Sequence, residues 1–308
     1  MDFSLCEELC TVVYNSDHTL TEISRFQIPF SYVCIAGFCN GMFCLHKYLT
    51  NVLYLWNPSI RKFKKLPNAR FYFPYSRSCV TFGLVYQAQN NDFKILRIVC
   101  YKGIGQVNTL QVKADVYTLS TDSWREVVIE VESQTRYNGH IPESYCLFLN
   151  GALHTIVKST ERGYILSFDV NDVRFRKIML PQSYFNEAFY SDIEELAMIK
   201  GSLAIIVFCN NIDELYGTCH IWVMREYGVV ESWTKKSVPM DWVYNFYVCT
   251  DNGELLIEND TGLVSFDPET LNENKLAIED AQWMDYTPNS MESLVLLDGL
   301  NVSSEYEH

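Results

Sequence analysis

One repeated unit shows most plainly how this chain is organised: residues 146–181 read CLFLNGALHTIVKSTERGYILSFDVNDVRFRKIMLP. Short apolar runs alternate here with turn signals, which is the pattern of four short antiparallel strands. Asn150 and Gly151 indicate the first turn, because both residue types tolerate a positive φ. Asp169 indicates the last turn, since its side chain can accept hydrogen bonds from the backbone just beyond it. Pro181 then stops the ladder, because proline has no N–H to donate.

The same landmarks recur along the chain at a period of roughly 50 residues, which is typical of a repeat architecture. Glycine turns stand at Gly41, Gly151, Gly201 and Gly253, with intervals of 110 (151−41), 50 (201−151) and 52 (253−201). One unit between the first two has therefore lost its glycine. A strand-ending aromatic precedes a small turn residue at Trp56-Asn57, Tyr117-Thr118, Phe168-Asp169 and Phe266-Asp267. Leucine or valine followed by proline closes units at Leu66-Pro67, Leu180-Pro181 and Val238-Pro239.

These landmarks predict an all-β fold, a β-propeller of kelch-like four-stranded antiparallel blades. Five units lie over residues 33–66, 80–129, 146–180, 196–238 and 245–278. Strands at 11–14, 22–28 and 293–297 could form a sixth from both termini and close the ring, so we expect five to six blades. A helical period is indicated only briefly, around 191–196. We expect one domain over 1–299 and a disordered tail over 300–308; the alternative is a sandwich or two stacked barrels.

Composition excludes several classes of protein. The 308 residues carry a formal charge of −14 and a pI near 4.9, which argues against nucleic acid and anionic membranes as partners. The 11 cysteines form no Cys-x-x-Cys pair and suit buried thiols in a reducing compartment. The acidic start MDFSLCEEL is no signal peptide, and the longest apolar run, Leu203–Cys209, is far too short to span a bilayer. We therefore expect a cytoplasmic and/or nuclear protein.

No motif for catalysis, a cofactor or a metal emerges from the sequence. The six histidines lack metal-ligand spacing, and Gly103-Ile-Gly105 lacks the third glycine of a dinucleotide site. His46 and His154 follow glycine turns at what reads as one repeat position, which favours packing over a ring of ligands. The pairs Glu194-Glu195 and Asp213-Glu214 read as solvated loop charges. The tryptophans at blade positions, expected in the core, are Trp56, Trp222 and Trp233.

Three connections between blades are unusually aromatic, and they should emerge on one face of a propeller. They are NARFYFPYSR (68–77), QSYFNEAFYSD (182–192) and MDWVYNF (240–246). Exposed aromatics with arginine are typical of protein interfaces, although large aromatics also seal gaps between blades. The candidate protein-binding residues are Arg70, Phe71, Tyr72, Phe73, Tyr75, Tyr184, Phe185, Phe189, Tyr190, Trp242 and Tyr244.

An ordered series of segments resembles the F-box-associated domain of plant F-box proteins, often labelled F-box/kelch-repeat. The most specific are IWVMREYGVVESWTK (221–235) and GLVSFDPETL (262–271). Others are CNGMFCLHK (39–47), YLWNPSIRKFKKLP (54–67), FGLVYQAQNNDFKILRI (82–98), ADVYTLSTDSWREV (114–127), LNGALHTIV (149–157) and ILSFDVNDVRFRKIMLP (165–181). The chain departs from the family at Thr155, where a tryptophan usually stands.

The resemblance implies a non-catalytic protein-recognition domain, the substrate-binding part of a Skp–cullin–F-box ubiquitin ligase that presents a target protein for ubiquitination. The family places a helical F-box before this domain, and nothing like it precedes Phe3. We therefore expect this chain to contact the Skp adaptor and cullin only if an upstream F-box exists. One alternative is a stand-alone binding module or decoy without ligase recruitment. Another is a propeller hydrolase, which would need convergent carboxylates or histidines in the central channel.

Overall fold

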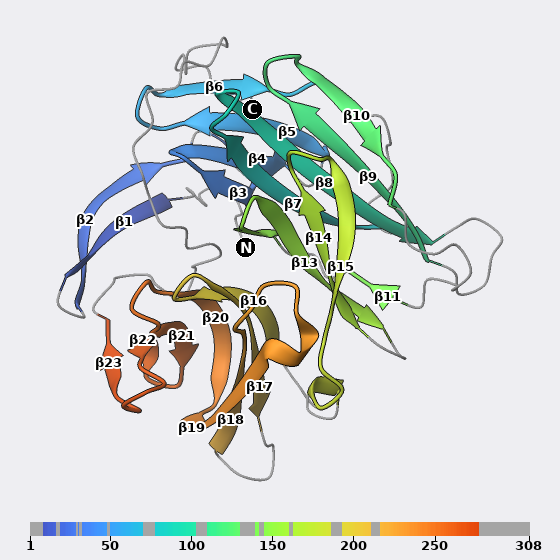
Figure 1. The fold of residues 1–308 in the computed structure, drawn as a ribbon. Coiled ribbons are helices and arrows are strands. Elements are labelled where there is room, and N and C mark those ends of the chain that lie inside the picture. The colour runs from blue at the N-terminus through green and yellow to red at the C-terminus, as the bar shows by residue number, and fades with distance from the viewer. Residues whose placement is uncertain are drawn as a thin grey trace.

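The computed structural model describes residues 9–16, 19–28, 30, 33–47, 50–69, 78–102, 110–129, 139–141, 145–159, 163–185, 193–210 and 216–276. Within these ranges the chain forms five antiparallel blades and one separate hairpin, and each blade runs in chain order from an inner to an outer strand. The prediction of an all-β propeller is therefore confirmed, with five blades among the described residues (Figure 1).

The blades follow one another along the sequence. The first contains β3 (Cys34–Cys39), β4 (Met42–Lys47), β5 (Val52–Asn57) and β6 (Lys62–Lys65). The second contains β7 (Ser78–Gln87), β8 (Asp92–Lys102), β9 (Leu110–Thr118) and β10 (Ser123–Val127). The third contains β13 (Ala152–Ser159), β14 (Tyr164–Asp169) and β15 (Arg174–Met179), with two short strands, β11 (Gly139–His140) and β12 (Leu147–Leu149), paired to the inner side of β13.

The last two blades have the same plan. The fourth contains β16 (Ile193–Ile199), β17 (Ser202–Asn210), β18 (Tyr216–Met224) and β19 (Trp233–Asp241), with the short 3₁₀ turn η2 (Val230–Ser232) between β18 and β19. The fifth contains β20 (Val243–Cys249), β21 (Leu255–Asn259), β22 (Gly262–Phe266) and β23 (Glu273–Lys275). The separate hairpin is β1 (Leu9–Ser16) with β2 (Thr19–Gln27).

Local turn chemistry shapes each blade as the sequence predicts. Asn40 and Gly41 have φ values of 48° and 73°, and Asn150 and Gly151 have 50° and 77°. Two successive positive φ angles characterise the type I′ turn, whose twist matches that of a hairpin. In the second blade, which has no glycine here, Asn91 takes the positive φ instead. The Asp169 carboxylate accepts hydrogen bonds from two backbone N–H groups beyond it, as expected of a turn residue.

Two local expectations are corrected by the structure. Residues 193–199 form the inner strand β16 and not a helical segment: Ala197 packs toward the fifth blade and Leu196 toward the third, as expected of a strand. Pro239 does not end its strand: it pairs with Thr218 inside β19, which continues to Asp241. Proline is tolerated there because β19 is the outermost strand of its blade and needs no further ladder partner.

The core lies between neighbouring blades, in four successive layers of buried side chains. Trp56, Trp222 and Trp233 are all buried, which confirms that they belong to the core. Inner strands approach closely where the second and third blades meet. There the Cys146 N–H donates to the Phe82 carbonyl oxygen at 2.7 Å, and Gly83 leaves no room for a side chain.

Two further apolar layers lie on the first and fifth blades, on the faces that would meet where the ring closes. One, on the first blade, contains Phe43, Leu45 and Trp56; the other, on the fifth, contains Leu256 and Leu263. In the view of Figure 1 the dark-blue β1–β2 hairpin lies between these two blades, as expected of N-terminal strands that close the ring. The predicted strand at 293–297 lies outside the described residues, and the domain limits 1–299 stay a prediction.

Candidate protein-binding surface

The candidate surface is the side of the propeller on which the chain passes from the outer strand of one blade to the inner strand of the next. We call it the crossing face and define it by the described parts of these connections, residues 66–69, 180–185 and 241–243. The hairpins between the second and third strands, such as that from β13 to β14, open on the same side, because antiparallel strands alternate in direction. The greater part of the aromatic connections 68–77 and 182–192 lies outside the described residues, so the expectation that they share one face stays a prediction.

A hollow of about 280 Å³ opens on the crossing face where three blades meet. Its walls come from the end of β13, the start of β16 and the start of β20. Small-molecule pockets usually measure ~300–1,000 Å³, so this hollow better fits one side chain of a partner than a whole small ligand. The lining residues are Lys158, Ile193, Glu194, Glu195, Tyr244, Asn245 and Phe246.

The hollow is lined by two carboxyl groups, those of Glu194 and Glu195, and by one cationic side chain, Lys158. Lys158 Nζ lies 2.6 Å from Glu194 Oε2, and the Glu194 side chain is only 5% exposed. Glu195 leaves β16 on the opposite face, because successive side chains of a strand alternate. Burial raises the pKa of Glu195 to about 7; Lys158 opposes this rise and the charge of Glu194 adds to it. Glu195 is therefore partly protonated near neutral pH, and a cation placed beside it would favour its ionised form.

The fifth blade supplies an aromatic and polar rim to the hollow. Tyr244 is 52% exposed, and its hydroxyl donates to the Asp260 carboxylate, which raises the pKa of the phenol. Asn245 Nδ2 donates to Glu258 Oε2 at 2.7 Å, and the Tyr247 hydroxyl donates to the same oxygen at 2.8 Å. These contacts hold Tyr244 and Asn245 in place beside Glu195.

The predicted binding residues have different fates in the structure. Tyr244 is exposed and lines the hollow. Trp242, two residues earlier in the chain, is partly buried. Tyr184 is only 2% exposed: its ring packs against Trp222 and Phe185 between the third and fourth blades, so it seals a gap and is not available to a partner. The candidates outside the described residues are Arg70, Phe71, Tyr72, Phe73, Tyr75, Phe189 and Tyr190.

Sequence reasoning missed the acidic hollow itself. Glu194 and Glu195 read as solvated loop charges, but they lie on the inner strand β16 and are largely withdrawn from solvent. The local sequence holds no signal for this, because the partner Lys158 comes from the preceding blade. Asp213 and Glu214 lie outside the described residues.

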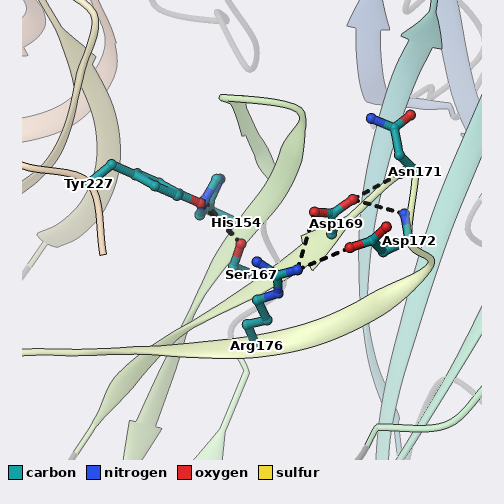
Figure 2. Close-up of polar contacts among 7 residues, drawn as sticks. All are labelled: His154, Ser167, Asp169, Asn171, Asp172, Arg176 and Tyr227. Carbon is teal, nitrogen blue, oxygen red and sulfur yellow. Dashed lines mark hydrogen bonds and ion pairs between the residues drawn. The ribbon is translucent and has the colours of Figure 1, made fainter. Parts of the chain in front are cut away.

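A second polar cluster joins the third and fourth blades (Figure 2). It lies on the side opposite the crossing face, because the hairpins between third and fourth strands open there. Tyr227, in the connection from β18 to β19, reaches the third blade and its hydroxyl lies 2.6 Å from His154 Nε2. Ser167 Oγ lies 3.2 Å from the same nitrogen, and His154 Nδ1 lies 3.2 Å from the Leu147 carbonyl oxygen. Nδ1 therefore carries the proton and Nε2 accepts. Burial lowers the pKa of His154 to about 4, so the ring is neutral at physiological pH.

The two histidines that follow glycine turns do not form a ring of ligands. His46 lies five residues after Gly41 and His154 three after Gly151, so they do not share a repeat position. His46 Nε2 lies 3.1 Å from Asn51 Oδ1, and its ring packs against Phe82. Among the residues that the structure describes, no group of three or more His, Cys, Asp or Glu side chains is placed to hold a metal ion. No helix in the described part of the chain is long and apolar enough to cross a membrane.

Comparison with known proteins gives a family match over almost the whole chain. The model of the F-box associated beta propeller domain matches residues 2–289. An F-box/kelch-repeat protein of Arabidopsis thaliana is 24% identical over 267 residues, which cover 83% of this chain and 65% of that protein. The F-box protein CPR1 of Arabidopsis thaliana is 27% identical over 273 residues, which cover 80% of this chain and 64% of that protein.

The chain thus spans slightly less than two thirds of the length of these curated relatives. Solved structures are more distant. The Bombyx mori GH32 beta-fructofuranosidase BmSUC1 is 13% identical, with a TM-score of 0.42 over 74% of this chain and 53% of that one. The tricorn protease is 10% identical, with a TM-score of 0.30 over 84% of this chain and 27% of that one. Similarity at this level carries no argument about chemistry.

Proposed function

Because the chain belongs to the F-box associated beta propeller family, we propose that it is the target-binding domain of an F-box protein and does no chemistry itself. The observation that carries the proposal is the family match over residues 2–289, together with curated relatives that are named F-box proteins. In such a protein an F-box would recruit the Skp adaptor and cullin, and the propeller would hold the target. Holding the target near the ubiquitin-charged enzyme raises its effective concentration at the transfer site.

The crossing face is the surface that we propose for target binding. It combines an exposed aromatic ring, Tyr244, with a hollow of side-chain size and an acidic side chain, Glu195, that a nearby cation would ionise. Aromatic residues around a partly desolvated pocket are typical of interface hot spots. The formal charge of −14 would also steer a basic segment of a target toward the protein. The proposed target is therefore a protein with an exposed lysine or arginine, met in the cytoplasm or the nucleus.

The hydrolase alternative has less support from this geometry. Glycoside hydrolases need two carboxyl groups that flank one bond and face each other across it. Glu194 and Glu195 leave β16 on opposite faces, and Glu194 is already paired with Lys158. The decoy alternative shares the binding surface with the receptor and differs only in ligase recruitment.

Affinity capture with matched variants tests the surface. The crossing-face variant is Glu195→Gln with Tyr244→Ala. The control is Glu231→Gln with Leu271→Ala, which removes one carboxylate and one exposed large hydrophobic side chain from the opposite side. Proteins from a plant cell extract are quantified on wild type, variant and control. We expect some proteins to be captured equally by wild type and control, and their captured amount to be at least about tenfold lower on the crossing-face variant, as is typical when hot-spot residues are lost. Equal capture by all three folded proteins would contradict the proposed surface.

Sequencing the 5′ end of the native transcript distinguishes the receptor from the decoy. An F-box encoded in frame upstream of Met1 would support the receptor. A native start at Met1 would favour a stand-alone binding module, and ubiquitination would then be the wrong assay.

A further inference from the structure

Two cysteines of the second blade stand directly opposite each other on neighbouring strands. In the antiparallel pair of β7 and β8, Cys79 is the register partner of Cys100, between the pairs Ser78–Tyr101 and Val80–Val99. Directly paired residues project from the same face of a sheet, with Cα atoms about 4.5–5.5 Å apart. Disulfides need Cα atoms about 4.4–6.8 Å apart, so a bond between these two residues requires no large movement of the backbone.

The two thiols differ in access to solvent. Cys100 is 3% exposed in the core layer between the second and third blades, and Cys79 packs against the same layer but is partly exposed. Burial, with a smaller contribution from Cys79, raises the pKa of the Cys100 thiol to about 12. A dissolved oxidant therefore reaches Cys79 first, and Cys100 is positioned to react with the product.

We propose that Cys79 and Cys100 form an oxidation site that a peroxide converts to a disulfide linking β7 to β8 at the crossing face. Hydrogen peroxide oxidises the Cys79 thiol to a sulfenic acid, with one oxygen transferred and water released. The Cys100 sulfur then attacks the Cys79 sulfur, its proton leaves with the hydroxyl as a second water, and the S–S bond forms. The peroxide is reduced and the two thiols are oxidised by two electrons in total.

Other cysteines close in space do not have this geometry. Cys209 pairs with Thr218 and Cys219 with Phe208, so these two thiols project from opposite faces of the fourth blade. Cys34 stands opposite His46, which makes Cys44 only its diagonal neighbour. Diagonal Cα atoms lie about 7–8 Å apart, beyond the usual span of a disulfide.

Cys146 belongs to the same core layer but is out of reach of Cys79. It lies against Gly83, four residues further along β7. Four residues of strand span about 13 Å, which is far longer than a disulfide can bridge.

Peptide mapping after mild oxidation tests the proposal. The purified full chain is treated with hydrogen peroxide, remaining thiols are blocked, and the protein is digested with trypsin without reduction. Cys79 then lies in peptide 78–94 and Cys100 in peptide 98–102, so their bond appears as a cross-linked pair that dithiothreitol separates. Cys209 and Cys219 share peptide 201–225 and serve as the internal control. We expect the 79–100 link to form at least about tenfold faster than any other, given its geometry.

Single variants make the mechanism falsifiable. In Cys100→Ser, Cys79 should stop at the sulfenic acid and be trapped by dimedone; in Cys79→Ser, neither the link nor the adduct should form. Cys219→Ser should leave the 79–100 link unchanged. The proposal is overturned if oxidised wild type contains no 79–100 link, if Cys209–Cys219 forms as fast, or if Cys100→Ser gives no adduct on Cys79.

Discussion

At the residue scale, burial changes the acid strength of Glu195 more than any neighbouring charge does. Its pKa is about 7 in the folded protein against an ordinary value of 4.5. Between these two pH values the folded state binds the proton more tightly than the unfolded chain, so the free energy of unfolding falls as the pH rises from 4.5 to 7. Above pH 7 the side chain is ionised in both states, and the loss in the free energy of unfolding stays constant.

Glu195→Gln should remove this cost. We expect the variant to equal wild type near pH 4.5 and to melt at a higher temperature at pH 8, as measured by thermal unfolding at both pH values. Comparing the two proteins cancels the contributions of His46 and His154. Their pKa values are lowered to about 4, so they act in the opposite direction when the pH falls below 6.5. Equal melting temperatures of both proteins at pH 8 would show that Glu195 is not buried in this way.

Thr155 is a buried residue whose polar atom does not titrate. Its hydroxyl is buried and has no hydrogen-bond partner among the described residues. Thr155→Val keeps the shape and removes the unsatisfied group, so we expect the free energy of unfolding to rise by ~1 kcal/mol. Urea denaturation measures it as a higher midpoint with an unchanged slope. Thr155→Ser, which keeps the hydroxyl and loses the methyl, should move the midpoint down.

At the element scale, close contacts between inner strands and the connection from β18 to β19 add to the apolar layers that join neighbouring blades. A Cβ atom added to Gly83 on β7 would lie 2.8 Å from the Cys146 Cβ and 2.9 Å from the Leu153 Cδ1. Gly83→Ala should therefore push the second and third blades apart and lower the free energy of unfolding by ~1–3 kcal/mol. A cycle with Leu153→Ala, also read by urea denaturation, should show favourable coupling. This packing would be contradicted if Gly83→Ala had the urea midpoint of wild type and if the free-energy changes of the two substitutions simply added.

The connection from β18 to β19 joins the fourth blade to the third through Tyr227. Tyr227→Phe removes the hydroxyl at 2.6 Å from His154 Nε2 and leaves Ser167 as the remaining donor. We expect a loss of ~1 kcal/mol in the free energy of unfolding, since the nitrogen keeps one partner. When Tyr227→Phe is introduced into His154→Leu, its effect on the free energy of unfolding should be close to zero. A full effect that persists without His154 would mean that Tyr227 acts through packing alone.

At the scale of the whole molecule, a propeller hides its sheet edges and faces only when the ring is closed. The first blade keeps Phe43, Leu45 and Trp56 buried on the face away from the second blade, beside the β1–β2 hairpin in Figure 1. A chain that begins at residue 28 should therefore bind an apolar dye such as ANS and unfold at a lower temperature than the full chain. A chain that begins at residue 9 keeps the hairpin and should behave as wild type does. Identical melting of all three chains would show that the hairpin does not close the ring.

Much of the blade architecture could be predicted from the sequence because its signals are local. Asn150-Gly151 and Asp169 specify turns through their own backbone angles and hydrogen bonds, and alternation along a strand needs no distant partner. The repeat of these signals then indicates a propeller, and the three tryptophans at blade positions are buried as expected.

The site depends instead on which side chains meet across blades, and that is a property of the tertiary structure alone. Glu194 looks solvated until Lys158, 36 residues earlier (194−158), is brought to 2.6 Å from it. Tyr184 reads in the sequence as one more aromatic residue of an interblade connection, yet it fills the space beside Trp222. Burial and charge pairing are set by what the adjoining blade places opposite a residue. A local pattern therefore specifies the hairpins, and only the packed ring specifies which of their residues a partner can reach.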